Sequence, residues 1–167
     1  DETELFFDEE DAKKEAERLA GEKIPVTVIK LENSQMLPFY TSLYTMGINA
    51  LLVCEEDEKT MVQLTDFVRR KKNEEIPEGK VWVENPALHL TALYFLQEAR
   101  RKPAQEMSEE TKGMQEELLA HFTQGRYIFP IRKDGKGVPL ARLGNGDTYQ
   151  PIFTDILEFQ KFNKDDQ

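Results

Sequence analysis

The chain has 167 residues, of which 39% are apolar and 32% are charged, and its formal net charge at pH 7 is -10. This length fits one ordinary domain, or two small units that share a core. The acidic balance argues against a nucleic-acid surface, because binding to phosphates needs clustered Lys and Arg. No run approaches the ~18 to 20 uninterrupted apolar residues of a membrane span, so we expect a soluble protein with no membrane contact.

The cysteine content bears on the compartment. The single cysteine, Cys54, excludes an internal disulfide and fits a reducing environment, which predicts a cytoplasmic protein. The chain starts at Asp1 instead of Met, so we expect that an upstream segment was removed or lies outside this sequence.

The first fifty residues predict a helix, a strand and a shorter helix. Apolar residues at helical spacing predict a helix over Glu9–Ala20. The β-branched run Ile24–Glu32 predicts a strand that ends in an Asn-Ser turn. We expect a hydroxyl of Thr41 or Ser42 to cap a short helix, which Gly47 ends.

A buried strand and two further helices are predicted next. Asn49–Glu56 reads as the strand, and Glu58–Lys72 carries an apolar stripe that predicts a helix on the face of a sheet. A short strand over Val81–Val83 leads to Asn85, a good helix cap, and then to a helix from Pro86 to about Lys102.

A second series of elements follows an acidic linker at Glu106–Glu110. Met114–Phe122 predicts a helix that ends at a glycine. Two glycine turns, "DGKG" and "GNGD", then separate three short strands of a meander, which we expect at 126–133, 138–143 and 148–153. A last helix over Asp155–Phe162 is capped by Thr154 or Asp155.

One pattern occurs twice in the chain. "QMLPFYTSLYTM" at Gln35–Met46 and "TYQPIFTDILEFQKF" at Thr148–Phe162 both place a Pro-aromatic-Thr step before an amphipathic run. We interpret this as an internal duplication, with a first unit at 1–104 and an incomplete second unit at 105–167. The predicted fold is α+β, with mixed or antiparallel sheets, helices packed on one side and a duplicated helix-strand-helix unit.

These segments carry a resemblance to a known family. "PIFTDILEFQKFN", preceded by "VPLARLGNGDTYQ", and also "VWVENPALHL" resemble the bacterial enhanced serine sensitivity family, SseB. The resemblance implies an α+β fold and a family without an established enzymatic activity. The second copy lacks the strand-helix-strand-Asn-Pro half that the first copy has. We therefore expect either that the natural chain extends beyond Gln167 or that the second unit completes its sheet with the first.

The sequence predicts no catalytic site, metal site or cofactor. His89 and His121 lie in amphipathic helices without zinc-ligand spacing, which indicates boundary residues. Acidic residues after Cys54 are expected to raise its pKa, which opposes a nucleophilic role. The glycines of "GKGVPLARLGNG" fit hairpins and not a phosphate loop.

The strand-to-helix junctions are the candidate binding sites. Capping is the ordinary role of Thr41, Ser42, Thr154 and Asp155, and ligand binding at both junctions is the functional alternative. Trp82 and Phe153 are expected in the core.

Charge runs suggest a kind of partner. The basic cluster Arg69–Lys72 fits the last turns of a helix, where it complements the dipole. Acidic runs at Asp1–Asp11, Glu55–Glu58 and Glu106–Glu110 fit solvated loops and helix starts, or a docking surface for a basic partner. The sequence thus predicts a non-enzymatic protein that acts through a protein or peptide partner. The alternative is a small-molecule-binding domain with a cleft between the two units.

Overall fold

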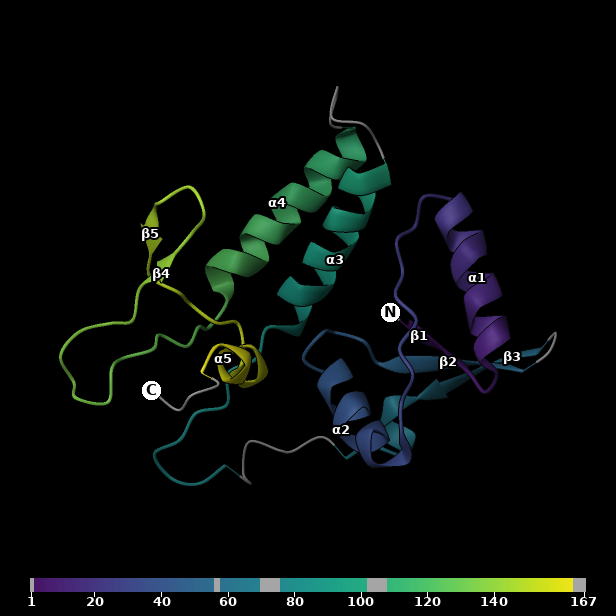
Figure 1. The fold of residues 1–167 in the computed structure, drawn as a ribbon, viewed down its shortest axis with the longest axis horizontal. Coiled ribbons are helices and arrows are strands. Elements are labelled where there is room, and N and C mark those ends of the chain that lie inside the picture. The colour runs from purple at the N-terminus through teal and green to yellow at the C-terminus, as the bar shows by residue number, and fades with distance from the viewer. Residues whose placement is uncertain (1, 56–57, 70–75, 102–107, 164–167) are drawn as a thin grey trace. The chain divides into compact units, whose positions relative to one another are not determined.

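The computed structural model describes residues 2–55, 58–69, 76–101 and 108–163 (Figure 1). Within these ranges the chain forms five α-helices, one 3-10 helix and two small sheets, so the predicted α+β class is confirmed. In chain order the elements are β1 (Glu2–Phe6), α1 (Glu9–Gly21), α2 (Asn33–Leu43), β2 (Ala50–Glu55), β3 (Glu58–Gln63), the 3-10 helix η1 (Leu64–Asp66), α3 (Pro86–Arg101), α4 (Glu109–Gln124), β4 (Ala141–Arg142), β5 (Thr148–Tyr149) and α5 (Ile156–Phe162).

The chain divides into two compact units, each built from two stretches of sequence. Unit 1 comprises Asp1–Arg70 and Pro86–Thr123, and unit 2 comprises Lys71–Asn85 and Gln124–Gln167. Helices α3 and α4 therefore belong to the same unit, and the boundary differs from the predicted one after residue 104. Of the predicted linker, 106–107 lie outside the described residues, Ser108 precedes α4, and Glu109 and Glu110 lie in its first turn.

Unit 1 contains a three-stranded mixed sheet in the order β1-β2-β3. Strand β1 runs parallel to β2, with Phe6 opposite Cys54. Strand β2 runs antiparallel to β3, with Leu52 opposite Met61. The predicted strand at Asn49–Glu56 is thus confirmed as β2, the central strand.

The core of unit 1 lies where α2 meets one face of this sheet. Leu5 of β1 packs on this core, whereas Glu15 of α1 approaches Lys59 on the opposite face. Helices therefore lie on both faces of the sheet and not on one side only. The buried core residues are Tyr40, Leu43, Tyr44, Ile48, Leu51, Leu64 and Val68.

The turn after α2 confirms that Gly47 ends this helical segment. The Ile48 amide donates to the Leu43 carbonyl at 3.0 Å and the Gly47 amide to the Tyr44 carbonyl at 3.1 Å, as in a Schellman motif. Gly47 has φ +80°, and a Cβ on it would lie 2.6 Å from the Pro86 carbonyl oxygen. Both the backbone angle and the close approach of α3 therefore require glycine here.

The predicted strand at Ile24–Glu32 is wrong. The segment has no regular secondary structure, and Ile29 is 59% exposed. β-branched residues favour a strand only where a neighbouring strand and a buried face receive them. No described strand pairs with this segment, and of its residues Leu31 packs against the core. Asn33 and Ser34, predicted as a turn after this strand, instead begin α2. At this helix start the Gln35 side-chain oxygen accepts a hydrogen bond from the Glu32 amide at 3.0 Å.

The predicted helix at Glu58–Lys72 is wrong over its described part. The segment forms β3 and then η1, because pairing with β2 overrides the helical period of the sequence. Leu64 and Val68 are buried as the apolar stripe predicts, but Met61 is 56% exposed. Residues 70–72, with most of the predicted basic helix end, lie outside the described residues.

Helices α3 and α4 confirm two helix predictions. α3 begins at Pro86, the position that the sequence gives it, while the expected stop at Pro103 lies outside the described residues. α4 covers the predicted Met114–Phe122 and starts about one turn earlier, because Ser108 accepts the Thr111 amide at 3.2 Å and caps it.

Unit 2 has little regular structure, and the three-strand meander is mostly wrong. Its described ladder is the two-residue pair β4–β5, joined by the predicted "GNGD" turn, in which Gly146 has φ +91°. A single bridge joins Ile128 to Phe153. The "DGKG" turn is present, with φ +67° at Gly135, but its flanking residues form no strands.

The aromatic residues of unit 2 differ from the expected core. Val81–Val83 forms no strand, and Trp82 is 40% exposed, so its predicted core position is wrong. Phe153 is half-buried, with its ring 5.4 Å from Phe159 and 5.1 Å from Phe162. The predicted last helix is confirmed as α5, and it supplies both of these contacts.

Candidate functional site

Thr41 and Ser42 lie in the last turn of α2. The Thr41 hydroxyl donates to the Leu37 carbonyl at 2.7 Å, and the Ser42 hydroxyl donates to the Phe39 carbonyl at 2.6 Å. The prediction that one of them caps a helix start is wrong, because α2 begins at Asn33. Both hydroxyl protons are bound to the helix's own carbonyls.

Asp155 caps the start of α5, which confirms one of the two predicted caps, Thr154 or Asp155. It is 1% exposed, and its Oδ1 accepts the amides of Leu157 at 2.8 Å and Glu158 at 3.0 Å. Its Oδ2 accepts the Thr154 hydroxyl at 3.0 Å. Thr154 and Asp155 thus act together at a helix start in unit 2, whereas Thr41 and Ser42 belong to unit 1.

The two Pro-aromatic-Thr steps differ in local structure. Pro38 lies inside α2, whereas Pro151 precedes the cap of α5. The shared pattern therefore does not give the two junctions a common geometry, and their role in binding stays a prediction.

Asn85 connects three segments of unit 2. Its Nδ2 donates to the carbonyls of Arg126 at 2.7 Å and Thr154 at 2.6 Å, and its Oδ1 accepts the Arg126 amide at 3.0 Å. These bonds use the side chain to join segments of unit 2, and the cap on α3 stays a prediction. A Cβ on Gly125 would lie 2.8 Å from Oδ1, so glycine permits this approach.

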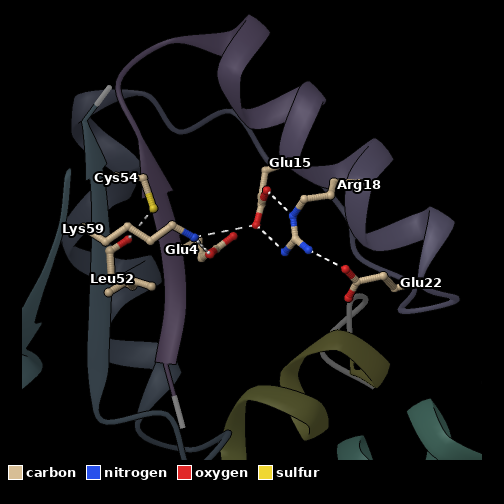
Figure 2. A network of polar contacts seen from close by, with 7 residues as sticks. All are labelled: Glu4, Glu15, Arg18, Glu22, Leu52, Cys54 and Lys59. Atoms are coloured by element: carbon tan, nitrogen blue, oxygen red, sulfur yellow. Dashed lines mark hydrogen bonds and ion pairs between the residues drawn. The ribbon is translucent and has the colours of Figure 1, made fainter. Parts of the chain in front are cut away.

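A chain of charged side chains links α1 to the sheet of unit 1 (Figure 2). Lys59 Nζ lies 2.8 Å from Glu4 Oε1 and 3.7 Å from Glu15 Oε1. Arg18 then joins Glu15 at 2.7 Å to Glu22 at 2.6 Å. The sequence gives no sign of this network, because its pattern predicts a helix at Lys59, whereas this residue lies on β3.

The surroundings of Lys59 and Cys54 make both side chains poor nucleophiles. The hydrogen bond to Glu4 is the main cause that raises the pKa of Lys59, so its amine stays protonated. Burial, followed by the Glu4 carboxylate, raises the pKa of the Cys54 thiol. The expected direction for Cys54 is confirmed, although burial outweighs charge as its cause. A protonated amine and a neutral thiol are poor nucleophiles.

The two histidines and the acidic residues suggest no metal centre in the described parts of the chain. His89 and His121 are half-buried, and His121 Nδ1 lies 3.1 Å from the Thr91 hydroxyl. In these ranges no three His, Cys, Asp or Glu side chains gather in a way that would hold an ion.

The charge of the chain is divided unequally. Unit 1 contains twenty-two of the 32 acidic residues and twelve of the 22 basic ones, while unit 2 contains ten of each. The formal charge of -10 therefore belongs entirely to unit 1.

Unit 1 also has an open depression with a charged lining. Its walls come from the end of α1, from α3 and from the start of α4. Binding sites for small molecules are mostly lined by apolar and aromatic side chains, which this depression lacks. The lining residues are Glu22, Lys23, Glu98, Arg101 and Glu110.

None of the described helices has the length and apolar character needed to cross a membrane. Comparisons of the chain with protein-family models, curated proteins and solved structures find no match.

Proposed function

We propose that this chain is a non-enzymatic cytoplasmic binding protein that recognises a basic protein or peptide partner through unit 1. The observation that carries the proposal is the concentration of the whole net charge of -10 in that unit. A surface of one sign attracts partners of the opposite sign and accelerates their encounter, and salt weakens this attraction. A bacterial, SseB-like origin is part of the same proposal and rests on the motif resemblance of the Asn-Pro and Pro-aromatic-Thr segments.

The chemistry of the charged network supports a binding role. Its lysine and its neighbouring cysteine are both held in their non-nucleophilic forms, as the pKa directions of Lys59 and Cys54 indicate. The charged lining of the depression on unit 1 favours a macromolecular partner over an apolar metabolite.

Affinity capture with charge variants tests this function. The tagged chain is incubated with its native cytoplasmic extract, and bound material is eluted as NaCl rises from about 50 mM to about 500 mM, where screening removes exposed interactions. The test variant changes four exposed carboxylates outside the ion pairs described above to amides, and the control keeps their charge by changing the same residues to Asp. These residues are Glu10, Glu17, Glu116 and Glu117.

We expect a basic protein that the wild type and the Asp control retain at low salt and that the Gln variant releases earlier. Equal retention by all three proteins would contradict a role for the charge of unit 1. A bound metabolite without a protein would favour the small-molecule alternative.

A further inference from the structure

We infer that the free edge of β3 is the docking site, and that a basic extended segment of the partner adds there as a fourth strand. This inference rests on the function proposed above and specifies where and how the partner binds. Addition of a strand to a sheet edge is a common mode of peptide recognition, in which main-chain hydrogen bonds give the affinity.

The edge of β3 is open among the described residues of unit 1. The sheet order β1-β2-β3 gives β3 one neighbour, and the main-chain groups on its other side make no hydrogen bond to a described residue. Five of its six residues are exposed, and Val62 is half-buried. An unpaired edge of this kind is a template for another strand.

The edge also lacks the features that usually prevent pairing. Natural edge strands carry a proline, a bulge or a lysine that points into the path of a new strand. The register of β3 with β2 is continuous from Glu58 to Gln63, and its sequence "EKTMVQ" has no proline. Its lysine, Lys59, forms ion pairs with Glu4 and Glu15 on one face of the sheet, so its side chain does not block the path of an added strand.

The opposite edge of the sheet is a poorer site. In β1, four of the five residues are half-buried, and this strand packs against α1. An added strand there would have less accessible side-chain surface to contact. The exposure pattern therefore favours β3.

Charge determines the occupant. β3 begins at Glu58 and pairs at that end with Glu55, so two carboxylates mark the start of the edge. The whole net charge of -10 lies in the same unit, which attracts Lys and Arg in an added strand and repels a second copy of this chain. We therefore expect a basic segment of another protein, because the acidic unit attracts it and does not repel it as it repels a second copy of this chain.

A synthetic peptide of alternating Lys and Val tests the inference on the full chain. The control peptide has the same sequence with every backbone nitrogen methylated, which keeps the charge but removes the main-chain donors. Binding is measured by fluorescence anisotropy at low salt, and amide exchange across β3 is measured by NMR with and without peptide.

We expect the unmethylated peptide to bind about tenfold or more tightly than its control. At a peptide concentration about ten times its Kd, it should slow exchange of the β3 amides that point away from β2 by about tenfold. Glu58→Gln should weaken this binding more than Glu2→Gln, which removes the same charge at the other edge. Equal binding of both peptides without protection of β3 would overturn the docking site and leave the proposed function standing. Protection, in the free chain, of the β3 amides that point away from β2 would also overturn the inference, whether or not it depends on protein concentration, because the edge would already be covered. Failure of both peptides to bind would count against the edge and against the attraction that underlies the proposed function.

Discussion

Asn85 and Arg126 exchange two hydrogen bonds, as two opposed residues do in an antiparallel ladder, but one partner contributes its side chain and the other its backbone. The amide group of Asn85 thus pairs with the Arg126 backbone as a neighbouring strand would, although neither residue lies in a described strand. A third bond, to the Thr154 carbonyl, extends this arrangement to the start of α5. Three described segments of unit 2 are therefore joined through one side chain.

Replacing this side chain should destabilise unit 2. Asn85→Ala leaves three backbone groups without their partner, and each such group costs about 1–3 kcal/mol when it is buried. We expect faster exchange of the Ile128 and Phe153 amides, which form the neighbouring bridge. Asn145→Ala, in an exposed turn of the same unit, is the control and should leave both rates nearly unchanged. Equal effects of the two variants would refute a special role for Asn85.

Two glycines in unit 1 should respond oppositely to alanine. Gly47→Ala forces a side chain into φ +80° and to within 2.6 Å of the Pro86 carbonyl, so it should cost more than about 2 kcal/mol. Gly113 lies inside α4, where an added Cβ would have no neighbour within 4 Å, so Gly113→Ala should stabilise by up to about 1 kcal/mol. Urea denaturation measures both changes, and the same sign for both would contradict the turn geometry.

Two buried tyrosines of unit 1 provide a second matched pair. The Tyr40 hydroxyl has no hydrogen-bond partner among the described residues, whereas the Tyr44 hydroxyl donates to the Val68 carbonyl at 3.1 Å. Tyr40→Phe removes an unsatisfied polar atom and should raise the free energy of unfolding by about 1 kcal/mol, while Tyr44→Phe should lower it by a similar amount. Thermal unfolding of both variants measures the difference, and a loss of stability in Tyr40→Phe would show that its hydroxyl is bound.

The charged network should make stability depend on acid. The hydrogen bond from Arg18 is the main cause that holds the pKa of Glu15 below its ordinary 4.5. A folded-state pKa below the unfolded one adds stability above pH 4.5, which is lost as the pH falls through the folded-state value. Glu15→Gln should therefore lose stability relative to wild type at pH 6, and this difference should shrink as the pH falls towards 3. Glu17→Gln, on the same helix, controls for the change in net charge. A stability difference between Glu15→Gln and wild type that grows as the pH falls would contradict a lowered pKa of Glu15.

Cys54 should react slowly with alkylating reagents. Burial raises the pKa of its thiol above the ordinary 9.0, so little thiolate is present at neutral pH. We expect iodoacetamide at pH 8 to modify the folded chain about tenfold or more slowly than the urea-unfolded chain. Modification at equal rates would indicate an accessible thiolate and would reopen a catalytic role for Cys54.

Local signals in the sequence predicted the parts of the fold that are decided locally. The helix stop at Gly47, the cap at Asp155 and the start of α3 at Pro86 each depend on the conformation of a few neighbouring residues, and all three are confirmed. Such signals act through the backbone at the same position, so distant contacts seldom reverse them.

The elements that the sequence predicts wrongly or does not indicate depend on contacts between distant segments. Ile24–Glu32 has strand-forming residues but no partner among the described segments, whereas the helical stripe of Glu58–Lys72 is overridden by pairing with β2. The bonds from Asn85 to Arg126 likewise depend on a contact that no local pattern indicates. The charged network of Lys59 was missed for the same reason, since its members come from three separate elements.

The parallel pairing of β1 with β2 also has a consequence for synthesis on the ribosome. β1 is made first, yet its partner follows only after α1 and α2, so at about 5–20 residues per second the nascent strand waits for seconds without a neighbour. The β2–β3 hairpin, by contrast, joins adjacent segments and closes within about 1–10 μs. During the seconds before β2 is translated, β1 is therefore a segment for a nascent-chain chaperone to shield.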